Sequence, residues 1–360
     1  MQTLQYYKQS FERFCAAGFD PSEARSLARI IISHVLGCEP GELLFHRQEE
    51  LDDHRCDLLT ERVLQGEPLQ YALGSSPFMG LDFLVGPGVL IPRFDSESLV
   101  ERAIQLLSEP WQEAAGAVAG DATATDKLAG SLLSGDATAT DKLAESLPSG
   151  DVTATDKLAG SLPSGDATAT DKLATSVSAT SVPSGDATTL RIADVCCGSG
   201  CLGLSLAHYL PRSQVFFTDI SPRALAMTQR NSLRLGLSRR CRFAQGDLAQ
   251  PLLESGWRPQ LLIANPPYIP SSELAQLSPL VQREPRLALD GGADGLALYP
   301  RLIAQARQLL PPGGLLLLEH GDEQQEQLWQ LLEQGGLEPL ERLRDLGGRP
   351  RGLLARQNAD

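Results

Sequence analysis

The chain has 360 residues, a length that commonly accommodates two domains, and its 42% hydrophobic content is typical of a globular protein with a sizeable core. The formal net charge of −14 argues against a general nucleic-acid binder, because free duplex DNA requires a basic surface. There is no signal-peptide core and no apolar stretch of membrane-spanning length, and the seven cysteines are odd in number. We therefore expect a cytoplasmic protein with reduced thiols and no membrane partner.

Residues 1–73 are predicted to form a small helical domain. One amphipathic helix is predicted over 20–37, with an N-cap, a first-turn proline, the acid of a capping box and a terminal glycine at Asp20, Pro21, Glu23 and Gly37. A second helical pattern runs over 53–74 and is expected to break near Gly66.

Residues 74–112 are predicted to contain a β-hairpin and a connecting helix. The segment "FMGLDFLVGPGVLIPR" (78–93) alternates in hydrophobicity on both sides of Gly86-Pro87-Gly88, which indicates a hairpin that turns there. The segment "SLVERAIQLL" that follows is expected to be helical.

Residues 113–189 form a low-complexity internal repeat. The unit "GDATATDKLAGSLLS" begins at Gly120 and returns with a period of 15 residues, and about half of the chain's net negative charge lies in this segment. Each unit carries only two or three leucine-class side chains, too few to offset the entropy of ordering the chain. We therefore expect a disordered linker rather than a folded array.

Residues 190–360 alternate between strand-like and helix-like patterns, which predicts a parallel α/β sheet with helices on both faces. The predicted strands are 190–195, 214–219, 241–247, 259–265 and 313–320. The predicted helices are 202–210, 222–236, 298–310 and 323–334. In such folds ligands bind beyond the carboxyl ends of the strands, where this chain places its unusual residues.

The first of these strands leads into a glycine-rich turn. Gly198, Gly200 and Gly203 form a GxGxxG pattern that opens a helix, and Asp219 ends the next strand. Such a turn lets a ligand approach the backbone, and the acid is placed to accept hydrogen bonds from ribose hydroxyls. The pair predicts a nucleoside cofactor and leaves both NAD and S-adenosylmethionine open.

Asn265-Pro266-Pro267-Tyr268 follows the fourth strand. Read alone, this stretch is equally well an abrupt turn. Hydride chemistry needs a poised acid or base, and none stands out here. Transfer of a methyl group to an NH₂ instead needs two fixed acceptors for its N–H bonds, which Asn265 Oδ1 and the Pro266 carbonyl would supply, while Tyr268 would cover one face of the planar group.

Outside the repeat, the sequence resembles the HemK/PrmC glutamine methyltransferases, which modify peptide chain release factors. The resemblance includes "GEPLQYALG", "VGPGVLIPRFDSESLVE", the glycine loop, the Asn-Pro-Pro-Tyr stretch, "REPRLALDGGADGL" and "LLPPGGLLLLEHG". It implies a Rossmann-like class I methyltransferase fold with a helical N-terminal domain joined by a β-hairpin. The implied reaction transfers a methyl group from S-adenosylmethionine to the side-chain amide of the glutamine in the GGQ motif of release factors.

The resemblance also assigns roles to residues of this chain. The implied cofactor contacts are Cys196, Cys197, Gly198, Ser199, Gly200, Asp219, Asp247, Leu248 and Asn265. The implied glutamine pocket consists of Asn265, Pro266, Pro267 and Tyr268, of which Asn265, Pro266 and Tyr268 are the catalytic candidates. The N-terminal domain would help to recognise the release factor, and we expect a monomer. Two departures from the family pattern are Cys196, where glycine is usual, and "PRFDSE", where Pro-Arg-Pro-acid-Thr-Glu is more common.

Three rival functions stay open at this point. A glutamine methyltransferase of a ribosomal protein fits less well because "FDSESLVE" matches the release-factor pattern. A DNA adenine methyltransferase would need a basic recognition region. A non-catalytic binding module would not need Asn265. No metal is expected, because the cluster of Cys196, Cys197 and Cys201 lacks zinc-site spacing, and the five histidines are assigned to surface or packing, with His320 the exception to check.

Overall fold

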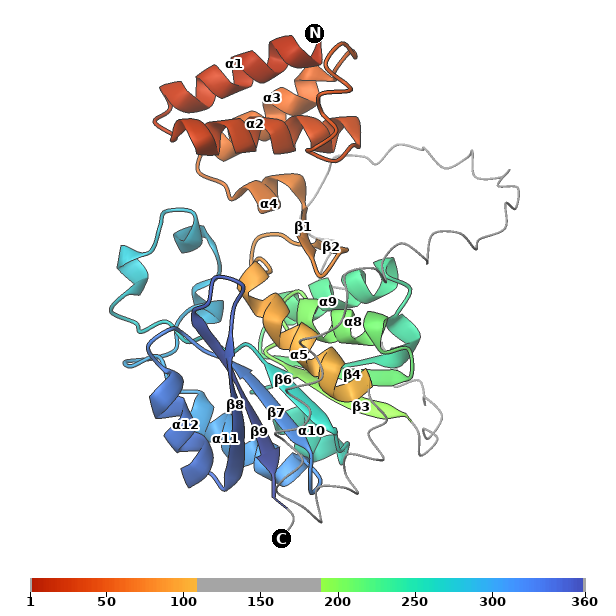
Figure 1. The fold of residues 1–360 in the computed structure, drawn as a ribbon, viewed down its shortest axis with the longest axis vertical. Coiled ribbons are helices and arrows are strands. Elements are labelled where there is room, and N and C mark those ends of the chain that lie inside the picture. Colours follow the sequence, from red (N-terminus) through yellow and green to blue (C-terminus); the bar gives the residue numbers. More distant parts are fainter. Residues whose placement is uncertain (1, 109–188, 359–360) are drawn as a thin grey trace, which may run out of the picture. The chain divides into compact units, whose positions relative to one another are not determined.

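A computed structural model describes residues 2–108 and 189–358 (Figure 1). The repeat predicted over 113–189 lies outside the described residues, apart from Thr189. The N-terminal segment is helical, as predicted, and its elements are α1 Thr3–Ala16, α2 Pro21–Leu36, α3 Asp53–Leu64 and α4 Leu69–Leu73. These helices share one apolar core that includes Tyr6, Phe14, Ile31, Ile32 and Val63.

Helix α2 confirms the predicted boundaries. Oδ1 of Asp20 accepts a hydrogen bond from the N–H of Ser22 at 2.8 Å, which satisfies one of the free donors of the first turn. Gly37 ends the helix in the left-handed region at φ 70°, a conformation that costs glycine little.

The predicted hairpin exists, but its predicted turn is wrong. Strands β1 Ser75–Phe78 and β2 Leu81–Leu84 pair antiparallel around Met79 and Gly80, which take φ values of 50° and 69°. A two-residue hairpin turn of this kind needs positive φ at both positions. The Gly86-Pro87-Gly88 stretch forms a separate turn after β2, closed by the bond from Val89 N to Gly86 O. The sequence does not predict the turn at Met79 and Gly80, because methionine rarely adopts positive φ.

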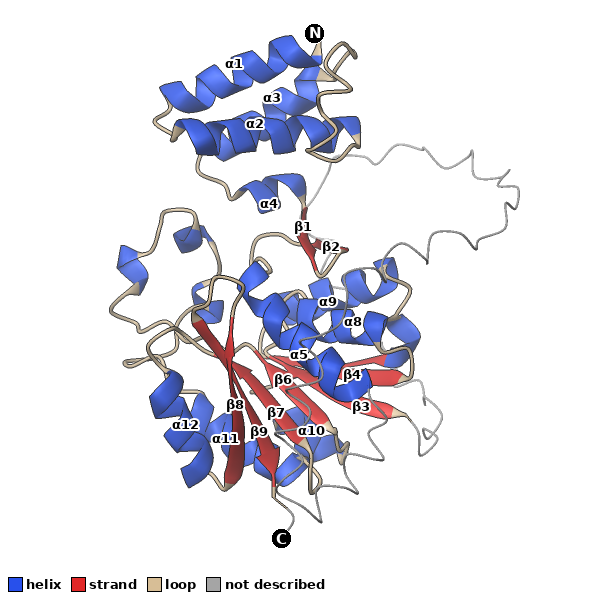
Figure 2. Cartoon of the chain, in the orientation of Figure 1, coloured by secondary structure: helices blue, strands red, loops and turns tan. Residues whose placement is uncertain are grey.

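The second part of the chain is a seven-stranded sheet in the order β5-β4-β3-β6-β7-β9-β8. Its strands are β3 Leu190–Val195, β4 Ser213–Asp219, β5 Cys241–Gln245, β6 Leu261–Ala264, β7 Leu315–Glu319, β8 Leu337–Arg344 and β9 Pro350–Gln357 (Figure 2). The five predicted strands are present and run parallel. The expectation of a wholly parallel sheet is wrong, since β9 pairs antiparallel with β7 and with β8.

Helices cover both faces of this sheet, as predicted. The α-helices are α5 Glu97–Ser108, α8 Cys201–Tyr209, α9 Pro222–Arg234, α10 Gln250–Ser255, α11 Tyr299–Leu309 and α12 Gln325–Gln334. Short 3₁₀ turns occur at η1 Phe94–Ser96, η4 Ser238–Arg240, η5 Leu274–Gln276, η6 Val281–Arg283 and η7 Arg286–Ala288. Among residues 2–108 and 189–358, no helix has both the length and the apolar character needed to cross a bilayer.

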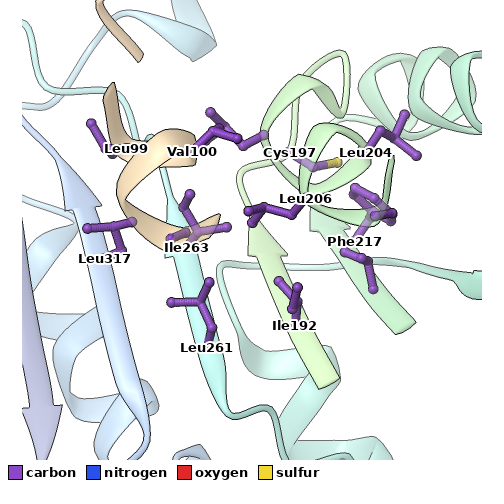
Figure 3. Packing of buried hydrophobic residues seen from close by; sticks show 14 of the residues in the cluster. Leu99, Val100, Ile192, Cys197, Leu204, Leu206, Phe217, Leu261, Ile263 and Leu317 are labelled. Atoms are coloured by element: carbon purple, nitrogen blue, oxygen red, sulfur yellow. The ribbon is translucent and has the colours of Figure 1, made fainter. Parts of the chain in front are cut away.

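Two apolar layers arise because successive side chains of a strand point to opposite faces. On one face Leu261 and Ile263 of β6 pack with α5, α8 and α9, as Figure 3 shows for residues of α5 and α8. On the other face Leu262 and Ala264 pack with α10, α11 and α12. Because β6 is buried on both faces, its apolar run has no polar interruption until Asn265.

Candidate active site

A pocket lies at the carboxyl ends of β3, β4, β5 and β6, as the topology predicts. The predicted cofactor residues in its wall are Cys196, Cys197, Gly198, Ser199, Asp219, Asp247, Leu248 and Asn265. Pro267 of the predicted glutamine pocket is also in the wall. Gly200, Pro266 and Tyr268 are not among the described residues that line it.

The glycine loop between β3 and α8 has the conformation that its glycines permit. Cys196, Gly198 and Gly200 adopt φ values of 60°, 57° and 79°. A Cβ on Gly200 would lie 2.5 Å from Cγ2 of Thr228, so a side chain there would clash with α9. Cys196 thus takes a backbone conformation that glycine adopts without strain, which explains why glycine is the expected residue there.

Gly203 and Asp194 lock the start of α8 against β3. A Cβ on Gly203 would lie 2.5 Å from Cε1 of Phe217 and 2.8 Å from Oδ2 of Asp194, and its N–H donates to that oxygen at 2.8 Å. Asp194 is fully buried, and burial raises the pKa of its carboxyl well above the ordinary value. Asp194 is not among the predicted site residues, although an acid inside the apolar run "LRIADV" is a signal for a buried polar group.

Asp219 is held at the end of β4 by two backbone donors. Its Oδ2 accepts from Gly198 N at 3.0 Å and its Oδ1 accepts from Ser221 N at 2.8 Å. Burial raises the pKa of this carboxyl, while these hydrogen bonds act in the opposite direction. Each carboxylate oxygen can accept more than one hydrogen bond, so Asp219 can still receive donors from the pocket.

Leu248 follows β5 in the left-handed region at φ 53°, and its side chain is buried in the pocket wall. Its carbonyl accepts from Oγ1 of Thr218 at 2.8 Å, which fixes this unusual conformation. The neighbouring Asp247 forms an ion pair with Arg301 of α11. Positive φ in a leucine is strained, and such strain is often found at binding sites.

Two polar side chains that we did not predict tie the wall together. Asn231 of α9 is buried and donates through Nδ2 to the carbonyls of Ser199 at 2.9 Å and Leu84 at 3.0 Å, and its Oδ1 accepts from Leu84 N. Glu284 is also buried, accepts from Ile91 N at 3.0 Å and pairs with Arg93. These contacts connect β2 and the segment after it to the glycine loop and to η6.

Asn265 and Pro267 stand at the end of β6 in the pocket wall, and the side chain of Pro266 is buried. Tyr268 is half-buried, and its hydroxyl donates to Oε1 of Glu319 at 3.4 Å. Its carbonyl accepts from Nε2 of Gln324 at 2.8 Å. That Tyr268 covers a substrate amide stays a prediction.

His320 resolves as a packing residue. It is fully buried, its Nδ1 lies 2.8 Å from the carbonyl of Gly321, and burial lowers its pKa, which favours the neutral ring. It is not among the described residues of the pocket wall. Within the described ranges, no cluster of three or more His, Cys, Asp or Glu side chains is arranged to hold a metal ion.

Two family models match the chain. That of the PrmC N-terminal domain covers residues 5–74, and that of the methyltransferase small domain covers residues 167–283. A release factor glutamine methyltransferase of Moorella thermoacetica is 33% identical over 99% of this chain and 98% of its own length. This chain belongs to the release factor glutamine methyltransferase family.

Other members of the release factor glutamine methyltransferase family are similar to this chain over most of its length. That of Rhodospirillum rubrum is 32% identical over 92% of this chain and 78% of its own length. That of Geobacter sulfurreducens is 31% identical over 84% of this chain and 79% of its own length. The solved structure of TrmN from Thermus thermophilus is 24% identical and covers 47% of this chain and 44% of that chain, with a TM-score of 0.34.

The family fits the architecture described above. The fold is a class I methyltransferase sheet preceded by a helical N-terminal domain and a β-hairpin, as the sequence predicts. The match to the PrmC N-terminal domain ends at residue 74 of this chain, and β1 begins at the next residue, Ser75.

Proposed function

We propose that this protein transfers a methyl group from S-adenosylmethionine to the side-chain amide nitrogen of the glutamine in the GGQ motif of peptide chain release factors. The observation that supports this most strongly is the position of Asn265. It stands at the carboxyl end of β6, in the wall of the same pocket as the glycine loop and Asp219. An amide acceptor and a nucleoside site therefore share one cavity.

The pocket residues fit S-adenosylmethionine. The carboxylate of Asp219 would accept hydrogen bonds from the ribose hydroxyls, and the apolar side chain of Leu248 would pack beside the adenine. The backbone of the loop at Gly198 and the N-terminus of α8 would favour the carboxylate of the methionine moiety. When bound, the cofactor supplies an electrophilic methyl group on a positively charged sulfur.

Asn265 and Pro266 would orient the substrate. An amide nitrogen is a weak nucleophile because its lone pair is delocalised into the carbonyl. Asn265 Oδ1 and the carbonyl of Pro266 would accept hydrogen bonds from its two N–H groups. These bonds would hold the nitrogen in line with the methyl group and increase the electron density on it. The proton then has to leave only after the nitrogen has gained the methyl group, so no strong base is needed in the wall.

The parts of the chain receive the following roles. Residues 1–73 form the domain that recognises the release factor, 74–112 contain the hairpin and connecting helix, 113–189 are a linker, and 190–360 form the catalytic domain. The protein acts as a cytoplasmic monomer on a protein substrate, without direct contact to nucleic acid.

Mass spectrometry tests the proposal directly. The protein is incubated with a release factor and isotope-labelled S-adenosylmethionine, in parallel with the same release factor carrying alanine for the GGQ glutamine. A label confined to that glutamine is expected. Labelling of a ribosomal protein or of DNA adenine instead, in parallel incubations, would replace this proposal by one of the rival substrates.

A further inference from the structure

A buried polar cluster lies behind the Asn-Pro-Pro-Tyr stretch, and the proposed chemistry does not use it. The hydroxyl of Tyr268 is 3.4 Å from Oε1 of Glu319 and 3.5 Å from Nη1 of Arg351. Ser96, which belongs to η1 and lines the pocket, is close enough to Glu319 to oppose the rise in the pKa of its carboxyl, and Oε2 of Glu319 has no hydrogen-bond partner among the described residues. The cluster therefore lies next to the pocket wall at Ser96 and next to the Asn-Pro-Pro-Tyr stretch at Tyr268.

The burial of this cluster is unusual for charged groups. Glu319 is 1% exposed and Arg351 is 7% exposed. Nη2 of Arg351 lies within 3.3 Å of three carboxylates, those of Asp95, Asp322 and Asp345. Taking ionisable groups out of water is costly, and well-packed apolar residues would often be at least as stable. Stability alone therefore does not explain why polar side chains occupy this position.

Hydrogen bonds also fix the main chain at Tyr268 and at the residue after it. Its carbonyl accepts from Gln324, and the oxygen of the Gln324 amide accepts from Gly321 N at 2.9 Å. Hydrogen bonds from Ile269 N to Leu289 O at 2.9 Å and from Gly291 N to Ile269 O at 2.8 Å hold the next residue. Of the groups around Tyr268, its hydroxyl is thus fixed by the charged cluster and its backbone by neutral groups.

We propose that Glu319 and Arg351 are positioning residues, which hold the ring of Tyr268 through its hydroxyl and so fix the wall that receives the glutamine amide. The proposal rests on the proposed function. It predicts an effect on methyl transfer rather than on cofactor binding, because Asp219, Leu248 and the glycine loop belong to other strand ends.

Four single variants and one double variant test the proposal, with single-turnover kinetics, cofactor calorimetry and thermal unfolding measured for each. At pH 8, above the raised pKa of Glu319, Glu319→Gln keeps the shape of the side chain and removes its charge. Arg351→Lys keeps the positive charge and removes the planar guanidinium group with its several hydrogen-bond donors. Arg356→Lys is the matched control, because Arg356 lies on the same strand and pairs with Glu338, away from Tyr268. Tyr268→Phe removes only the hydroxyl.

Glu319→Gln and Arg351→Lys are each expected to lower kcat about 10-fold, since a small misplacement of reacting groups is costly, with cofactor Kd changed by less than about twofold. Arg356→Lys should match wild type. In the Tyr268→Phe background, Glu319→Gln should lower kcat by less than about twofold, because the contact that it disturbs is already gone.

Two results would overturn the inference. One is a wild-type kcat in both Glu319→Gln and Arg351→Lys. The other is a fully additive loss in the Tyr268→Phe/Glu319→Gln double variant, which would mean that Glu319 does not act through Tyr268. If wild type itself transfers no methyl group to release factor, the proposed function fails instead, so the two failures are distinguishable.

Discussion

Asp219 shows how one side chain serves both the fold and the pocket. Its two carboxylate oxygens hold the glycine loop and the turn before α9 through backbone N–H groups, and the same carboxylate lines the pocket. A substitution here removes an acceptor for the cofactor and loosens the loop at the same time.

Asp219→Ala is expected to weaken the binding of S-adenosylmethionine by about 1.5–3 kcal/mol, the range for a hydrogen bond to a charged group. Isothermal titration calorimetry measures this. Glu338→Gln on β8, far along the sheet order from β4, is the control and should bind like wild type. An unchanged Kd for Asp219→Ala would remove this residue from the cofactor site.

Glu319 makes the stability depend on pH. Burial raises the pKa of its carboxyl from the ordinary value of 4.5 to about 7, so the folded state holds a proton that the unfolded state releases. The stability contributed by this group is complete below pH 4.5 and is lost as pH rises toward 7. Glu319→Gln does not titrate, so its free energy of unfolding relative to wild type should rise over this window, by on the order of 3 kcal/mol.

Urea unfolding at several pH values between 4 and 8 checks this expectation. The difference between the two proteins isolates Glu319 from the other groups that titrate in the same range. A difference that stays constant with pH, or that falls as pH rises, would contradict a carboxyl with a raised pKa at this position.

At the scale of elements, the junction of β3 and α8 depends on a glycine with no room for a side chain. A Cβ on Gly203 would overlap Phe217 of β4 and Asp194 of β3. Gly203→Ala is therefore expected to destabilise the protein by about 1–3 kcal/mol, as overpacking of a buried contact does. Thermal unfolding measures the loss.

Gly41→Ala is the matched control for this variant. A Cβ there would meet no atom within 4 Å and Gly41 does not have positive φ, so stability should be close to wild type. Equal stability of Gly203→Ala and Gly41→Ala would show that the helix start can shift to admit a methyl group.

The element boundaries also show what the sequence could predict. Patterns that depend on burial on both sides, such as "LRIADV" and the run before Asn265, gave β3 and β6 within a residue or two. The β8–β9 hairpin is not predicted from the sequence, because charged residues alternate along its exposed edge strand, as in "LEPLERLR", and make it resemble a surface segment. The β1–β2 turn was misplaced because tertiary context imposes positive φ on Met79.

At the scale of the site, the strand-and-helix pattern of the sequence predicts the side chains of the pocket wall but not the residues that hold them in place. Asp219, Leu248 and Asn265 follow strand ends, so parallel topology alone places them together. Asn231, Glu284 and Arg351 lie in a helix, a 3₁₀ turn region and an antiparallel strand, and only tertiary contacts bring them against Ser199, Ile91 and Tyr268. No spacing rule in one sequence predicts such contacts.

At the scale of the whole chain, the repeat separates α5 from β3 in sequence. Its composition offers few side chains that can join a core, so removing residues 113–189 should leave the melting temperature and methyl transfer close to wild type. Removal of α1, which contributes to the apolar core of the N-terminal domain, is the contrasting variant and should lower the melting temperature. A large loss of either property in the repeat deletion would make the repeat part of the fold or of the site.

The central claim is that Asn265 orients the substrate amide, and single-turnover transfer by Asn265→Ala tests it most directly. The variant should fold and bind cofactor, yet react at least about 10²-fold more slowly, because a nucleophile without its acceptor binds without alignment. Asn265→Asp keeps an acceptor and places a charge near the sulfonium, so it should also slow transfer while cofactor binding is kept or tightened. A rate for Asn265→Ala within about threefold of wild type would contradict the account and leave Asn265-Pro266-Pro267-Tyr268 as an abrupt turn.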